Sequence, residues 1–207
     1  PIKKPIHLYQ LLKEAAGFAL SGSNVKAEIN AEDDLWTVEA DFGQISQVFN
    51  NLILNAMQAM PHGGIIKVSA ENITLSGTYT MPLCNGGYVR VSVKDAGIGI
   101  PKENQAKIFD PYFTTKFTGS GLGLATAYSI VKSHDGHIEM DSTSELGTIF
   151  QVYLPASTVL GLDIPYKESG TLRGQGRILV MDDDPQILLT AQRMLKSMGY
   201  EAVLTTD

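Results

Sequence analysis

Residues 95–124 read DAGIGIPKENQAKIFDPYFTTKFTGSGLGL, and this stretch decides the fold. Its first motif follows directly after a strand-like run and consists of Asp95, Gly97, Gly99 and Ile100. A carboxylate at a strand end can meet the flat polar edge of a ligand, and the two glycines let the backbone approach closely. A simple turn that begins with Asp explains the same residues equally well.

The second motif of this stretch opens a predicted helix over 121–134 and consists of Gly119, Ser120, Gly121, Leu122, Gly123 and Leu124. Glycines at a helix N-terminus expose backbone N–H groups at the positive end of the helix dipole, which suits a phosphate. The spacing differs from the dinucleotide-binding fingerprint, and no Lys-Ser or Lys-Thr pair follows as in a Walker A loop. Alone, this Gly-rich turn is weak evidence for a nucleotide.

Between these motifs lie three aromatic residues, Phe109, Tyr112 and Phe113, followed by Lys116. The aromatic residues form either a small satellite core or a docking surface. Lys116 is either an ordinary surface lysine or a cation that reaches a terminal phosphate.

Residues 41–60 predict a long helix that begins at a capping box, Asp41 to Gln44. Its apolar face consists of Ile45, Val48, Phe49, Leu52, Ile53, Ala56 and Met60. Gln47, Asn51 and Asn55 are four residues apart, so they form one polar stripe. The stripe is either a solvated face or a source of amide oxygen for a hard cation such as Mg²⁺.

The remaining patterns predict the other elements of residues 1–155. We expect a helix over 7–20, a strand over 25–29 and its hairpin partner over 36–40. Further expected elements are strands over 65–70, 88–94, 137–141 and 148–154, and a short helix near 102–108.

The composition excludes several classes of protein. The net charge is −6, and an acidic chain is a poor nucleic-acid binder because phosphate neutralisation needs excess Lys and Arg. The single cysteine, Cys84, fits a reducing, cytoplasmic location. The sequence has neither a signal peptide nor an apolar run long enough for a membrane span, so we expect no direct membrane contact. Because the chain begins at Pro1, we expect it to be a piece of a longer protein that is itself soluble or membrane-anchored.

The four motifs, taken in their order and spacing, resemble the catalytic ATP-binding domain of two-component sensor histidine kinases, in the GHKL superfamily. The resemblance covers about residues 6–155 and rests on the N box Asn51–Asn55, the G1 box Asp95–Ile100, the F box Phe109–Lys116, the G2 box Gly119–Leu124 and the pair Gly147-Thr148. It implies an α+β fold of the Bergerat type, a two-layer sandwich with a mixed sheet and helices on one face.

The resemblance also implies a role for each motif. Asp95 would accept a hydrogen bond from the adenine amino group, and Thr148 would lie near the adenine. Asn55, supported by Asn51, would hold Mg²⁺ against the phosphates of ATP. The glycines of the G1 and G2 boxes would hinge a lid and offer N–H groups to the triphosphate, and the cofactors would be ATP and Mg²⁺.

The sequence departs from the family pattern after the N box. Many members carry Lys or Arg and then an aromatic residue at the positions of Gln58 and Ala59. Lys116 is the best candidate to replace the missing positive charge. The departure also keeps open a second reading, an ATP-sensing or scaffold module without phosphoryl transfer.

Asn51 distinguishes the kinases from the hydrolases of the same superfamily. DNA gyrase and the chaperone ATPases carry a Glu there as general base, and a neutral amide cannot take a proton from water. A GHKL-type ATPase is therefore disfavoured, and phosphoryl transfer to a histidine is favoured. The four histidines of this chain, His7, His62, His134 and His137, lie outside any acceptor motif, so we expect the acceptor on a helical hairpin elsewhere in the parent. His134 instead belongs to a structural turn between helix and strand.

Beyond Pro155 the composition changes, and we interpret 156–176 as a linker. Residues 177–207 predict a strand, a helix and a parallel strand, and they resemble the start of a response-regulator receiver domain. Asp182 and Asp183 would be its acidic Mg²⁺ pair, and an acidic turn after a strand is the alternative. The resemblance implies a hybrid kinase, with the histidine hairpin and a receiver domain as partners. A fragment this small needs a partner to bury its apolar surface, either the kinase domain or a second copy in a homodimer.

Overall fold

The chain divides into two compact units, Pro1–Leu160 and Gly161–Asp207. A computed structural model describes residues 1–77, 82–116, 119–143, 146–157, 174–183, 188, 191–192, 195–196 and 198–206. Most of the expected linker, 158–173, lies outside the described residues.

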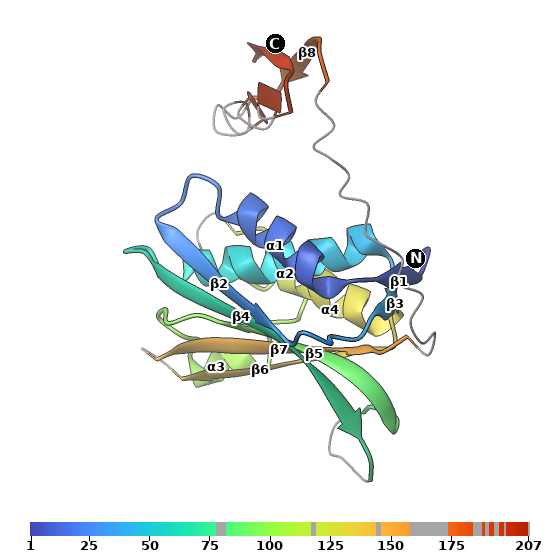
Figure 1. Ribbon diagram of the computed structural model, residues 1–207. Coiled ribbons are helices and arrows are strands. Elements are labelled where there is room, and N and C mark those ends of the chain that lie inside the picture. The colour runs from blue at the N-terminus through green and yellow to red at the C-terminus, as the bar shows by residue number, and fades with distance from the viewer. Residues whose placement is uncertain are drawn as a thin grey trace. The chain divides into compact units, whose positions relative to one another are not determined.

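The first unit is built on a five-stranded sheet in the order β2-β4-β5-β7-β6. Its strands are β2 (Val25–Ala31), β4 (Gly64–Leu75), β5 (Gly86–Lys94), β6 (His137–Thr143) and β7 (Gly147–Pro155). The pair β2–β4 is parallel and the other pairs are antiparallel. Three helices cover one face of the sheet (Figure 1): α1 (Leu8–Ala19), α2 (Phe42–Gln58) and α4 (Gly123–Ser133). The expected mixed sheet with helices on one face is confirmed.

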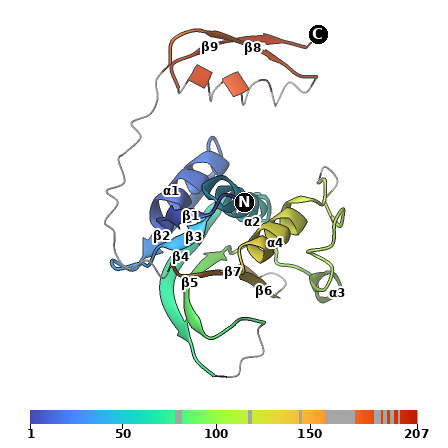
Figure 2. The same cartoon turned by 90° about the vertical axis from the view of Figure 1, so that its right-hand side faces the viewer.

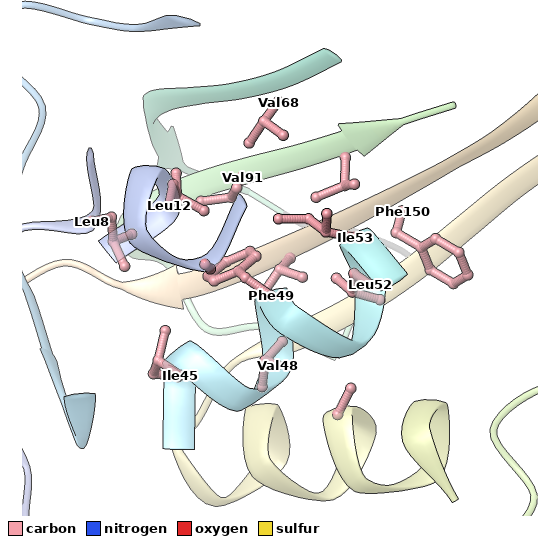
Figure 3. Close-up of a cluster of buried hydrophobic side chains, with 14 of the residues drawn as sticks. Leu8, Leu12, Ile45, Val48, Phe49, Leu52, Ile53, Val68, Val91 and Phe150 are labelled. Carbon is pink, nitrogen blue, oxygen red and sulfur yellow. The ribbon is translucent and has the colours of Figure 1, made fainter. Parts of the chain in front are cut away.

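The core lies between the sheet and α2, which is the middle helix of the three (Figure 2). All seven residues of the predicted apolar face of α2 are buried. Figure 3 shows this face between α1 and the strands, with side chains from Leu8, Leu12, Phe49, Leu52, Ile53, Val68, Val91 and Phe150. The helix α2 carries the N box and packs against α1 on one side and α4 on the other. This packing fixes the position of the polar stripe.

The predicted hairpin of 25–29 with 36–40 is wrong. β3 (Val38–Ala40) pairs with β1 (Lys4–Ile6), whereas β2 pairs with β4 in parallel. The long helix α2 lies between β2 and β4 along the chain and returns it to the same end of the sheet, which is the condition for parallel pairing. Alternation of apolar residues predicts a strand but does not identify its neighbour.

β4 and β5 extend beyond the predicted strands 65–70 and 88–94, to Leu75 at the end of β4 and back to Gly86 at the start of β5. Their extension carries a second apolar cluster on the sheet face away from the helices, formed by Leu75, Tyr88 and Tyr153 with Ile73 and Leu83. Arg90 binds Glu71 across the two strands at 2.9 Å. This cross-strand packing stabilises residues that show no clear alternation in the sequence.

The capping box predicted for α2 is half formed. The Asp41 carboxylate accepts from the backbone N–H of Gln44 at 3.1 Å, but the N–H of Asp41 donates to Nε2 of His134 at 3.0 Å. His134 is buried at the end of α4, and its Nδ1 lies 2.8 Å from the carbonyl oxygen of Ile130. The structural role predicted for this histidine is confirmed.

The second unit contains a parallel pair, β8 (Arg177–Met181) and β9 (Glu201–Thr205). Leu188, Ala191, Gln192, Leu195 and Lys196, between the two strands, are helical. The predicted strand-helix-strand order is confirmed for the described part of this unit. Within the described residues, no helix has the length and apolar character needed to span a membrane.

Candidate functional site

Asp95 lies directly after β5 and is buried, with 4% of its surface exposed. Its N–H donates to the carbonyl oxygen of Thr148 at 2.9 Å, which continues the pairing of β5 with β7. Its Oδ1 accepts from the backbone N–H of Gly97 at 2.8 Å and of Thr148 at 3.2 Å. Both of these bonds use Oδ1, so Oδ2 can accept from a ligand donor.

The environment of Asp95 acts on its pKa in two directions. Burial raises the pKa above its ordinary value because it removes water from the carboxylate. The N–H groups of Gly97 and Thr148 and the charge of Lys116 oppose this shift. A buried acid at a strand end, facing backbone donors and a lysine, is typical of a ligand-binding position.

Thr148 and Asp95 belong to a chain of hydrogen bonds that includes Ser142, a residue that the sequence did not single out. The Thr148 and Ser142 hydroxyls lie 2.9 Å apart, and Oγ of Ser142 accepts from the N–H of Ile100 at 2.8 Å. The Gln105 amide, in α3 (Lys102–Gln105), donates to the carbonyl oxygens of Ile100 and Ser142 at 2.8 and 3.0 Å. These bonds tie the end of the G1 box to the outer strand β6.

Two glycines of the site are required by close backbone approach. Gly147 has a φ of +96°, and a Cβ there would lie 2.2 Å from the carbonyl oxygen of Asp95. A Cβ on Gly97 would lie 2.6 Å from the carbonyl oxygen of Ala59, which also accepts from the N–H of Ile98 at 3.2 Å. The small Ala59 therefore fits where the end of α2 meets the G1 box.

Asn51 connects the N box to the G2 box. Its Nδ2 donates to the carbonyl oxygen of Gly123 at 3.0 Å, at the first residue of α4. A Cβ on Gly123 would lie 3.7 Å from the Asn51 side chain, which is ordinary contact. The structure therefore brings these two motifs together, although they are far apart in the sequence.

Asn55 and Gln58 of α2 accept hydrogen bonds from the ammonium group of Lys116. The distances from Nζ are 3.2 Å to Oδ1 of Asn55 and 2.6 Å to Oε1 of Gln58. Although much of the Lys116 side chain is exposed, partial burial of its ammonium lowers its pKa, and Asp95 opposes this shift. Lys116 thus reaches Asn55 and Gln58 from the loop before the G2 box.

The loop that carries Lys116, residues 112–121, is called the lid loop, and a hydrogen bond between Tyr112 and Gly121 closes its base. The N–H of Tyr112 donates to the carbonyl oxygen of Gly121 at 2.9 Å, and both residues have positive φ. A Cβ on Gly121 would lie 2.4 Å from the carbonyl carbon of Tyr112. Residues 117 and 118 lie outside the described ranges.

The three aromatic residues of the F box have different environments. Phe109 packs against Tyr128 and Phe150, with ring centroids 5.3 and 6.5 Å apart. Phe113 also packs on the main core, whereas Tyr112 is 76% exposed. Two of the three therefore pack against the core, and Phe109 contacts α4 through Tyr128.

The other expected site residues lie around this arrangement. Ile100 and Leu124 are half-buried and pack on the core, while Gly119, Ser120 and Leu122 are exposed at the end of the lid loop. Asp182 and Asp183 follow β8 in the second unit. The described residues hold no group of three His, Cys, Asp or Glu side chains suited to a metal. A cavity of about 520 Å³ lies elsewhere, between the start of α1 and the loop after β2, and includes none of the expected site residues.

Comparison with known proteins agrees with this geometry. Residues 40–158 match the family described as histidine kinase-, DNA gyrase B- and HSP90-like ATPase. The chain is 35% identical over 195 residues to the sensor kinase CckA of Brucella abortus, covering 87% of this chain and 21% of CckA. It is 36% identical to the sensor histidine kinase ZraS of Escherichia coli, covering 73% of this chain and 29% of ZraS. The chain thus spans less than a third of either relative.

Solved structures show the same fold. The catalytic domain of histidine kinase ThkA superposes with a TM-score of 0.60 at 32% identity, covering 74% of this chain and 95% of that domain. Full-length ShkA superposes with a TM-score of 0.61 at 23% identity, and the match covers 99% of this chain and 41% of the ShkA chain. Because the family match covers more than half of the chain, this protein belongs to the histidine kinase-, DNA gyrase B- and HSP90-like ATPase family, and its first unit is an ATP-binding catalytic domain of the histidine kinase type.

Proposed function

We propose that the first unit binds ATP with Mg²⁺ and transfers the γ-phosphoryl group to a histidine on a helical hairpin of the parent kinase. The observation that carries this proposal is the arrangement of Asp95, Asn55 and Lys116. Asp95 supplies a carboxylate for the adenine end, while Asn55 and Lys116 supply an amide oxygen and a cation for the phosphate end. The three residues come from the end of β5, from α2 and from the lid loop.

Asp95 selects adenine through Oδ2. Oδ1 already accepts two backbone hydrogen bonds, so the carboxylate is held in one orientation. An exocyclic amino group donates to a carboxylate oxygen, whereas the carbonyl of guanine at the equivalent position would face it as a second acceptor. Thr148, Gly97 and Gly99 lie next to Asp95 in the structure or the sequence and would border the base.

Asn55 fits the role of a magnesium ligand because its Oδ1 already contacts a cation, the ammonium of Lys116. Mg²⁺ prefers oxygen ligands and is typically held by one or two protein groups together with waters and phosphates. The metal would neutralise charge on the phosphates during transfer. Lys116 and the N–H groups of Gly119, Ser120, Gly121 and Gly123 would hold the phosphates in place.

Asn51 favours transfer over hydrolysis. Its neutral amide has no basic group for a water molecule, and its Nδ2 is engaged with the carbonyl oxygen of Gly123. The attacking group would instead be the nitrogen of the acceptor histidine. The ThkA and CckA similarities, both to kinases, support this reading.

For the second unit we propose the start of a receiver domain, which would make the parent a hybrid kinase. The parallel β8–β9 pair with helical residues between them, and Asp182 and Asp183 directly after β8, support this proposal. The CckA match covers 87% of this chain, so it extends beyond the first unit, which ends at Leu160. The acidic Mg²⁺ pair, the cytoplasmic location and exchange with a receiver domain belong to the same proposal.

The experiment that tests the kinase function uses the full chain and γ-labelled ATP. We expect binding of ATP with Mg²⁺ and no label on the chain alone, followed by acid-labile label on the parent's hairpin when it is added. Release of inorganic phosphate without the hairpin would instead show an ATPase. ATP binding without label on the hairpin would favour the sensing or scaffold module.

A further inference from the structure

The lid loop is fastened at two points in this structure. Its base is closed by the Tyr112–Gly121 hydrogen bond of 2.9 Å, and Lys116, within the loop, bonds to α2. Oγ1 of Thr114 accepts from the N–H of Lys116 at 3.1 Å, and the carbonyl oxygen of Lys116 accepts from the N–H of Gly119 at 3.2 Å. This local turn directs the Lys116 side chain toward α2.

The receiving groups on α2 form a pair of amide oxygens. Asn55 and Gln58 are three residues apart, so their side chains lie on the same side of the helix. One ammonium group donates to both, and the shorter bond, 2.6 Å, goes to Gln58. A neutral amide at position 58 accepts from the lysine, whereas Lys or Arg there would repel it.

The weaker of the two bonds occupies an atom that the proposed function needs. Oδ1 of Asn55 is the proposed magnesium ligand, and it cannot hold the ammonium and the metal in the same direction. The ammonium is also close enough to Asp95 for the two charges to affect each other's pKa. Lys116 therefore lies inside the space that the nucleotide would use.

We propose that Lys116 and Gln58 form a latch that closes the nucleotide site before nucleotide binds, and that magnesium-bound nucleotide must displace Lys116 from Asn55. The displaced ammonium then becomes available to the phosphates. Gln58 is a positioning residue in this scheme, because it acts on Lys116 and need not touch the nucleotide. The inference rests on the proposed ATP site and adds a competition between lysine and metal for one oxygen.

The test compares Gln58→Met with Gln47→Met in the full chain. Gln47 is an exposed glutamine on the same helix, 11 residues before Gln58 and so roughly 16 Å away along the axis. The first readout needs no nucleotide: trypsin cleaves after Lys116, and a latched lysine is protected. We expect Gln58→Met to be cut about threefold to tenfold faster at this bond, the range of one exposed hydrogen bond, and Gln47→Met to be cut as the natural chain is.

The second readout is calorimetric affinity for ADP with Mg²⁺, which lacks the γ-phosphate that Lys116 would contact. We expect Gln58→Met and Lys116→Met each to bind about threefold to tenfold more tightly, and the double variant to gain no more than either alone. Equal cleavage and equal affinity of Gln58→Met and Gln47→Met would overturn the latch. Failure of the natural chain to bind any adenine nucleotide would overturn the proposed function, while the cleavage readout would still decide the latch.

Discussion

The imidazole of His134 accepts a hydrogen bond from the backbone N–H of Asp41. The residue directly after α4 thus provides the acceptor for the N–H of the residue directly before α2. The other ring nitrogen faces the carbonyl oxygen of Ile130 and therefore carries the proton. The N box lies on α2 and the G2 box ends in the first turn of α4, so this bond joins the two helices at the ends away from both motifs.

Replacing His134 by Leu should destabilise the first unit by about 1–3 kcal/mol, because the part-buried N–H of Asp41 and the carbonyl oxygen of Ile130 would both lose a partner. Urea unfolding followed by the fluorescence of Trp36 measures this, since Trp36 is the single tryptophan of the chain. His62→Leu, at an exposed turn residue, is the matched control and should leave the unfolding midpoint in place. Equal midpoints for both variants would remove His134 from this role.

Asp95→Asn should weaken adenine nucleotide binding by roughly tenfold to a hundredfold with no loss of stability. The amide oxygen of Asn still accepts from Gly97 and Thr148, but its NH₂ group then faces the adenine amino group, donor against donor. Calorimetric titration with ATP measures the loss, and an unchanged affinity would exclude Asp95 from the site.

The same variant gives a pH test with a defined sign. Burial raises the pKa of Asp95 in the folded state, so the folded chain binds this proton more tightly than the unfolded chain does. The stability that Asp95 contributes is present below its ordinary pKa of 3.8 and is lost as the pH rises above that value. Asp95→Asn should therefore be at least as stable as the natural chain at neutral pH, and a lower free energy of unfolding there would contradict this assignment.

Ser142→Ala should weaken ATP binding by about threefold to tenfold, because the N–H of Ile100 loses its acceptor and the hydroxyl of Thr148 loses its neighbour. The effect comes from a looser G1 box and not from a direct ligand contact, so ADP and ATP should lose affinity equally. Ser129→Ala, at an exposed position of α4, serves as the control and should bind both nucleotides normally. A loss confined to ATP would place Ser142 at the phosphates instead.

Several of these residues could be predicted from the sequence, and others could not. The apolar face of α2, the carboxylate of Asp95 after a strand and the glycines of the lid follow from local spacing. The Asn51–Gly123, Ser142–Ile100 and Lys116–Gln58 contacts join residues separated by 72, 42 and 58 positions. Such contacts depend on how helices and strands are placed in space, which a local pattern does not contain. The neighbour of β2 was missed for the same reason.

On the outer face of the sheet, the hydroxyl of Tyr153 lies 2.6 Å from Oε1 of Glu139 and 2.7 Å from Oε1 of Gln151. Burial and the neighbouring carboxylate raise the pKa of Tyr153 to about 12 from the ordinary value of 10.0, although Arg90 opposes the shift. The stability contributed by the neutral phenol is fully present below pH 10 and is lost as the pH rises toward 12. An ultraviolet titration should show a late phenol that disappears in Tyr153→Phe, and an unchanged titration curve in that variant would contradict the assignment.

The second unit exposes apolar side chains on a strand pair that is too small to be stable without cover. Leu179 and Met181 of β8 are 66% and 65% exposed. The strand-helix-strand segment 177–207 is shorter than the roughly 40 residues below which a piece usually needs a staple or a partner to fold. We expect a second copy of the chain to provide this cover, so the mass in solution should rise with protein concentration.

The double variant Leu179→Lys/Met181→Lys should then stay monomeric, because two charges on each copy would be desolvated in the interface. Leu146→Lys, which changes an equally exposed leucine of the first unit, is the matched control and should associate as the natural chain does. Light scattering of the three proteins over a concentration series decides the matter, and a natural chain that stays monomeric throughout would show that a second copy does not cover β8.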